Sequence, residues 1–148
     1  MTNQQLINII LGFGAFAVVL FLLFYGFTSL CYQKFFRAYG YSHPGYAWIP
    51  FYRLYILADL TCTDPFVVGG FDIPKKYFVW WWVVVYVLAF IPGVGGFLSL
   101  LIEVICLGYC HHEGIKKLDP SYNNKVLSYV SSIFSIILWV IVLPKQAD

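Results

Sequence analysis

An uncharged apolar run near the N-terminus limits most strongly what this chain can fold into. Residues 6–30 form 25 consecutive positions without Asp, Glu, Lys or Arg. A helix of that length spans about 30 Å of hydrocarbon and leaves room for tilt. The residues before it contain no Lys or Arg, which the start of a secretory signal peptide requires. We therefore expect the run to remain in the protein as a transmembrane helix.

The overall composition supports a membrane protein. Hydrophobic residues make up 61% of the 148-residue chain and charged residues only 11%. A soluble domain has about 25% charged residues, so this chain lacks the polar surface that covers a globule in water. We expect residues 1–148 to form a single transmembrane domain without a separate soluble catalytic unit. Nine basic residues against seven acidic ones give no bulk charge that would attract a nucleic acid.

Two later apolar runs predict further crossings. Residues 77–110 are interrupted by a Gly-rich segment that starts at Pro92, which is typical of a turn between two helices; one long kinked helix is the alternative. The last run has no charged residue over 18 positions. The sequence therefore predicts an all-α integral membrane protein with four transmembrane helices, at about 6–30, 77–91, 97–112 and 126–143.

The basic residues predict the orientation. Eight of the nine fall between the first and second crossings or between the third and fourth, which places them on one side of the membrane. By the positive-inside tendency that side is cytoplasmic, and both termini lie outside. We therefore expect a multi-pass protein of the bacterial plasma (inner) membrane. The eight residues are Lys34, Arg37, Arg53, Lys75, Lys76, Lys116, Lys117 and Lys125.

A shorter apolar segment follows the first crossing and does not fit a spanning helix. Residues 50–60 begin with Pro50, contain Arg53 and Asp59, and would form a helix about 15 Å long. We expect an interfacial helix, and a re-entrant element that lines a polar cavity is the alternative. The next segment, residues 61–76, contains Pro and Gly pairs typical of turns, so we expect an irregular cytoplasmic loop there.

Aromatic side chains gather near the predicted membrane boundaries. Indole and phenol rings favour the headgroup region of a bilayer. We expect Arg53 to extend toward lipid phosphates with its aliphatic stem covered by neighbouring tyrosines. The expected interface anchors are Trp48, Tyr52, Tyr55, Trp80, Trp81 and Trp82.

Three segments carry a resemblance to a protein family. They are KFFRAYG at 34–40, PGYAWIPFYRLY at 44–55 and WWW at 80–82. Over residues 35–114 the chain resembles an uncharacterised family of small bacterial membrane proteins with a Gly-Trp-x-Ala-x-Ile-Pro-x-Tyr-Asn-x-Tyr motif and a Trp-rich helical hairpin. Some of its members carry a signal-peptidase-related description. The resemblance implies a four-helix membrane fold with no known activity, and this chain departs from the motif at Tyr46 and Arg53.

Glu103 is the one acidic residue within a predicted crossing. Ionisable groups in that position usually face a cavity or a partner, because burial in hydrocarbon is costly. Glu103, Arg53 and Asp59 are therefore candidates for partner binding or for lining a polar cavity. A proton or cation path through Glu103 is one form that such a cavity would take.

Four neighbouring side chains are weak candidates for a metal site: Cys106, Cys110, His111 and His112. Thiolate and imidazole groups bind zinc, but paired ligands usually follow Cys-x-x-Cys or His-x-x-x-His spacing. We therefore expect these residues to pack within the bundle, and we expect no metal and no cofactor.

A stripe of serines follows the last predicted helix. Small polar residues allow another helix to approach closely and accept hydrogen bonds, so we expect helix packing there. No motif supplies a base that would make one of them a nucleophile, and the sequence predicts no catalytic residue. The stripe consists of Ser128, Ser131, Ser132 and Ser135.

These features favour a non-enzymatic integral membrane protein. We expect an accessory or scaffold subunit of a membrane assembly, in contact with the lipid bilayer and with a protein partner or a second copy of itself. The alternative is a small oligomeric transporter or channel component that uses Glu103 and Arg53 in a polar cavity. Four helices cannot enclose a wide pore alone, so this alternative requires self-assembly.

Overall fold

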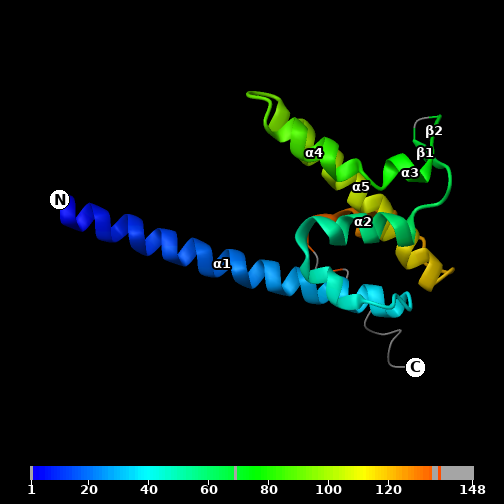
Figure 1. Cartoon of the computed structure of the whole chain (residues 1–148), viewed down its shortest axis with the longest axis horizontal. Coiled ribbons are helices and arrows are strands. Elements are labelled where there is room, and N and C mark those ends of the chain that lie inside the picture. The colour runs from blue at the N-terminus through cyan, green and yellow to red at the C-terminus, as the bar shows by residue number, and fades with distance from the viewer. Residues whose placement is uncertain (1, 69, 135–136, 138–148) are drawn as a thin grey trace.

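The computed structural model describes residues 2–68, 70–134 and 137. The chain is mostly helical, which confirms the predicted helical class, and one short β-hairpin interrupts the helices (Figure 1). In chain order the elements are α1 (Asn3–Ala38), η1 (Pro44–Trp48), α2 (Pro50–Thr61), β1 (Phe66–Val68), β2 (Phe71–Ile73), α3 (Lys75–Phe78), α4 (Trp81–Ala89), α5 (Gly95–Leu118) and α6 (Lys125–Ile133).

Helix α1 has two halves with different surroundings. Its start is fixed by a capping box, in which the Thr2 hydroxyl accepts from the Gln5 backbone N–H and the Gln5 side chain accepts from the Thr2 backbone N–H. From residue 3 to residue 24 every side chain is exposed, and this half projects away from the other helices (Figure 1). From residue 25 onward α1 becomes progressively buried and contributes Phe35 and Phe36 to the core.

Helices α4 and α5 pack against each other as a hairpin. The turn between them uses Gly93, whose φ of +84° is a left-handed conformation that glycine adopts without strain. At Gly95 an added Cβ would collide with the Leu88 carbonyl oxygen, so only glycine permits this close approach. The break at Pro92 is therefore a turn between two helices and not a kink in one.

The first arm of this hairpin is shorter than the predicted helix over 77–91. The chain forms the separate helix α3, then turns at Trp80 before α4 begins. Phe78, Val79 and Trp81 are all buried, whereas Trp80 is exposed. Phe78 packs on the ring of Phe66 in β1, a tertiary contact that accompanies the break between α3 and α4.

Residues 61–76 differ from the irregular loop that the sequence predicts. Strands β1 and β2 pair antiparallel, with Phe66 opposite Ile73 and Val68 opposite Phe71. Their connection has two residues, and Gly70 adopts a φ of +86°. A two-residue loop rich in glycine between β-branched and aromatic residues is typical of a tight hairpin. Phe66 is buried and its ring packs 4.0 Å from that of Phe78, which ties the hairpin to α3.

Helix α6 is also shorter than predicted. Within the expected crossing over 126–143, α6 ends at Ile133, and residues 135–136 and 138–143 lie outside the described residues. Two serines in α6 donate to backbone carbonyls three residues earlier, Ser131 to Ser128 and Ser132 to Tyr129. Such bonds compete with the regular helical pattern, which is consistent with an early helix end.

Two of the described helices, α1 and α5, are long and apolar enough to cross a membrane. Helices α4 and α6 have nine residues each, which gives about 14 Å at 1.5 Å per residue, or half of a hydrocarbon core. The sequence predicts four transmembrane helices. In the part of the chain that is described, two helices are long and apolar enough to be such crossings. The predicted interfacial helix at 50–60 corresponds to α2, which packs against α5.

Candidate functional site: a buried polar network and an aromatic pocket

A network of buried polar side chains joins three helices. His111 of α5 is fully buried and contacts the Tyr32 hydroxyl of α1 through Nε2 at 3.0 Å and the Ser131 hydroxyl of α6 through Nδ1 at 2.9 Å. Each contact joins residues that are far apart in the sequence. The imidazole ring therefore links both α1 and α6 to α5.

The proton positions in this network follow from the hydroxyl of Ser131. It donates its one proton to the Ser128 carbonyl oxygen at 2.6 Å, so it can only accept from His111. His111 is then the Nδ1–H tautomer, and its Nε2 accepts from the Tyr32 hydroxyl. A serine nucleophile needs the reverse arrangement, with the imidazole accepting its proton. This geometry suits a structural tether and does not activate Ser131.

The other serines of the predicted stripe have different surroundings. Ser128 is fully buried, and its Oγ lies 3.4 Å from His112 Nδ1 and 3.0 Å from the Tyr122 hydroxyl. Ser132 donates to a carbonyl of its own helix. Ser135 lies outside the described residues.

Arg53 faces α1 and not the tyrosines of its own helix. Its guanidinium donates to the Ser29 hydroxyl at 3.2 Å and lies 5.1 Å from the Tyr25 ring centroid and 5.6 Å from that of Tyr32. These are cation–π distances. The guanidinium is therefore directed to aromatic faces of α1, and the expectation that Tyr52 and Tyr55 cover the Arg53 stem stays a prediction. The Nε atom of Arg53 is buried without a hydrogen-bond partner.

The structure places the two predicted carboxylates in separate regions. Glu103 is half-buried on α5 and interacts electrostatically with Arg53, although the two form no ion pair within 4.0 Å in the part of the chain that is described. Asp59 is exposed and pairs with Lys75 at 3.0 Å. Only Glu103 and Arg53 are thus near each other among the three candidate cavity residues.

The thiols and imidazoles of α5 do not converge on one point. Cys110 Sγ lies 3.7 Å from Cys62 Sγ of α2, while His111 points to α1 and α6. Cys106 is also buried, and His112 lies near Ser128. Among the residues that the structure describes, no group of three or more His, Cys, Asp or Glu side chains is arranged to hold a metal ion.

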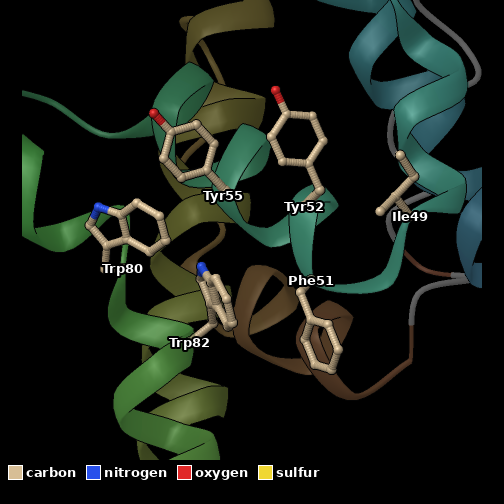
Figure 2. A pocket seen from close by; sticks show the side chains of 6 residues that line it. All are labelled: Ile49, Phe51, Tyr52, Tyr55, Trp80 and Trp82. Atoms are coloured by element: carbon tan, nitrogen blue, oxygen red, sulfur yellow. The ribbon is translucent and has the colours of Figure 1, made fainter.

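Some of the predicted interface anchors form a pocket where α2 meets the start of α4. Its volume is about 500 Å³, and Figure 2 shows the side chains around it. Tyr52 and Tyr55 have parallel rings with centroids 5.9 Å apart, and Trp80 lies 5.5 Å from Tyr55 and 5.9 Å from Trp82. The lining residues are Ile49, Phe51, Tyr52, Tyr55, Trp80 and Trp82.

The other two anchors lie apart from this pocket. Trp48 is exposed, donates through its indole N–H to Gln33 at 3.2 Å, and accepts from the Tyr25 hydroxyl through its backbone carbonyl. Trp81 is buried at the base of the α4–α5 hairpin, and its indole nitrogen has no partner.

The sequence reasoning missed the contribution of α1 to the network. Tyr25, Ser29 and Tyr32 recur at intervals of four and three residues, which places them on one helix face. This polar stripe within an apolar run was the available signal. Tyr39, just after α1, was also missed; its hydroxyl donates to the Gly114 carbonyl at 2.6 Å. Burial, reinforced by the nearby Glu113 carboxylate, raises the pKa of Tyr39, so it keeps its proton for that bond.

Comparison with known proteins finds no matching family model, no similar curated protein and no similar solved structure.

Proposed function

We propose that this chain is a non-enzymatic integral membrane protein that acts as an accessory or scaffold subunit of a membrane assembly. The observation that carries the proposal is the exposed apolar half of α1. Residues 3–24 contain no charge, and large side chains such as Phe13 and Phe24 are more than 70% exposed. At about 1.5 Å per residue this half measures about 33 Å, close to the thickness of a bilayer core.

The arrangement of the apolar segments supports insertion from one side. We call the described parts of residues 25–76 and 103–133 the body of the molecule. The N-terminus of α1 and the tip of the α4–α5 hairpin both project from the same side of this body in Figure 1. Residues 77–102, which include α4 and the first part of α5, carry no charge. The basic residues from Lys34 to Lys125 belong to the body at the other end. By the positive-inside tendency the body faces the cytoplasm of a bacterial cell.

The proposed topology has α1 as one crossing and the α4–α5 hairpin as an inserted pair. Local thinning of the bilayer accommodates the short α4 and leaves the hairpin tip at the far surface. A further crossing over 126–143 remains a prediction from the sequence, because residues 135–136 and 138–143 lie outside the described residues; with it the chain would have four membrane elements and both termini outside. This matches the fold of the uncharacterised four-helix family that the motif at 44–55 resembles, and we propose membership in that family.

The saturated polar network favours a scaffold over an enzyme. His111, the best-placed base, has both ring nitrogens engaged in hydrogen bonds that tie helices together. Exposed aliphatic and aromatic side chains remain along α1 and on the outer face of the hairpin. Within a membrane these faces contact lipid or the transmembrane helices of another protein.

The test of this proposal is purification of the tagged protein in a gentle detergent, followed by mass spectrometry of the proteins that come with it. A carbonate wash of the membranes is done first. We expect the chain to stay in the washed membranes and to carry a stoichiometric partner through purification. Release by carbonate would contradict membrane integration, and purification as a lone monomer would contradict a scaffold role.

A second candidate function is transport, and the pair Glu103 and Arg53 favours it. Both side chains are partly buried near each other without a direct ion pair, and Arg53 Nε lacks a partner. A permeant ion or a proton path would use such a pair in an oligomer. The test is ion flux into liposomes that contain the purified protein. Flux that Glu103→Gln abolishes, with oligomeric state unchanged, would support transport, and absence of flux in the unaltered protein would exclude it.

A further inference from the structure

The aromatic pocket between α2 and α4 has the chemistry of a cation-binding site. Its walls present the faces of Tyr52, Tyr55, Trp80 and Trp82 around one hollow of about 500 Å³ (Figure 2). That volume lies in the range of small-molecule sites. Aromatic faces attract ammonium and quaternary ammonium groups that approach within about 6 Å of a ring centroid.

The charges around the pocket suit a ligand that is neutral overall. None of the lining residues is charged. Arg53 lies between the two tyrosines in the sequence, but its guanidinium is directed to α1. Asp59, one turn after Tyr55, is paired with Lys75 at 3.0 Å. An anionic ligand would therefore meet no unpaired cation in the pocket, and an ammonium group would meet no repulsion from its lining.

The indole nitrogen of Trp82 adds no polar contact to the pocket. It is buried out of reach of solvent, so a ligand in the hollow meets the ring of Trp82 and not its N–H. The pocket therefore offers an aromatic site for a cation, without a donor from Trp82 for an anion.

The position of the pocket indicates where its ligand comes from. It lies where Lys75 and Lys76 give way to the uncharged hairpin of residues 77–102. In the proposed topology this is the level of the cytoplasmic headgroups. Ile49 and Phe51 form the apolar part of the lining, next to which an acyl chain can continue.

We propose that this pocket binds the ammonium-bearing headgroup of a zwitterionic phospholipid, with the ammonium over the aromatic rings. The assignment rests on the proposed membrane location and deepens it. It differs from general interfacial anchoring by tryptophan because it requires one saturable site with headgroup selectivity.

The test is calorimetric titration of the full-length protein in maltoside micelles. The probes are dihexanoylphosphatidylcholine and dihexanoylphosphatidylglycerol below their own micelle concentrations, with empty micelles as the blank. We expect saturable binding of the choline lipid, at least about tenfold tighter than the glycerol lipid. Equal affinities, or no saturable binding, would overturn the proposal.

Three variants locate the site. Trp82→Leu and Trp80→Leu each remove one aromatic face, and we expect each to weaken binding of the choline lipid about threefold. Trp48→Leu is the matched control, because Trp48 is an exposed tryptophan outside the pocket, and the affinity of this variant for the choline lipid should be unchanged. Circular dichroism verifies that each variant is folded, and unchanged binding in either pocket variant would overturn the proposal.

A further titration distinguishes binding of a lipid from binding of a soluble cation. Tetramethylammonium chloride alone should bind at least tenfold more weakly than the choline lipid, because it has no acyl chain to contact Ile49 and Phe51. Affinity equal to that of the lipid would overturn the lipid assignment. This result and the carbonate wash test different claims. If the chain stays in the washed membranes but binds no headgroup, only the pocket proposal is contradicted. If the chain is released by carbonate, the membrane proposal is contradicted.

Discussion

Ser131 and Ser132 are adjacent in the sequence but differ in their partners. Ser131 accepts from the buried His111, whereas Ser132 bonds only within α6. Ser131→Ala removes the hydroxyl that accepts from His111 Nδ1–H, although the imidazole also interacts with the Ser128 backbone carbonyl, so we expect the free energy of unfolding to fall by about 0.5–1.5 kcal/mol. Ser132→Ala should change it by less than about 0.5 kcal/mol. Thermal unfolding in detergent measures both, and equal losses would contradict the assigned network.

All four cysteines are buried thiols. Cys62 lies next to the predicted cytoplasmic loop but is only 4% exposed, so it does not report on topology. We expect a maleimide reagent to label the folded protein in detergent slowly and to label all four thiols once the protein is denatured. Mass spectrometry counts the adducts. Rapid labelling of Cys62 in the folded protein would contradict its burial against Cys110.

At the residue scale the sequence predicted which side chains carry polarity but not their partners. Glu103, Arg53 and His111 stand out in an apolar chain by type alone. Their partners come from helices far away in sequence, such as Tyr32 for His111. Periodicity within one helix shows which residues share a face, but it does not show which helix covers that face.

Gly108 controls the packing of α6 on α5. An added Cβ at this position would collide with the ring of Tyr129. Overpacking of this kind costs about 1–3 kcal/mol, so Gly108→Ala should lower the melting temperature. Gly96→Ala is the matched control, because no atom lies within 4 Å of a Cβ there. Circular dichroism in detergent measures the melting temperatures of both variants. A Gly108→Ala variant as stable as the Gly96→Ala control would contradict the packing of α6 on α5 at this position.

At the scale of the elements, the sequence located α1, α2 and the turn at Pro92 from apolar length and from Pro and Gly positions. These are local signals. It placed helix ends poorly where tertiary contacts decide them. The break at Trp80 arises because Phe78 packs on Phe66 of the β-hairpin while Trp81 packs at the base of α4. The hairpin itself was missed because its strands have only three residues each.

At the scale of the whole molecule, a charged body carries two apolar projections. The exposed half of α1 and the α4–α5 hairpin leave this body on the same side (Figure 1). The central claim is that both projections enter one membrane and the body stays on its cytoplasmic face. Composition predicted a membrane protein, but the relation between the projections depends on how α1 packs on the body through Arg53 and His111.

The most direct measurement is the labelling of single introduced cysteines in intact cells with a membrane-impermeant maleimide. Gly96→Cys places an exposed thiol at the hairpin tip, and Asp72→Cys places one on the exposed face of β2. The buried native thiols keep the background low. We predict that Gly96→Cys reacts in intact cells and that Asp72→Cys reacts only after the membrane is permeabilised. Labelling of both from the same side, or the reverse pattern, would contradict the account.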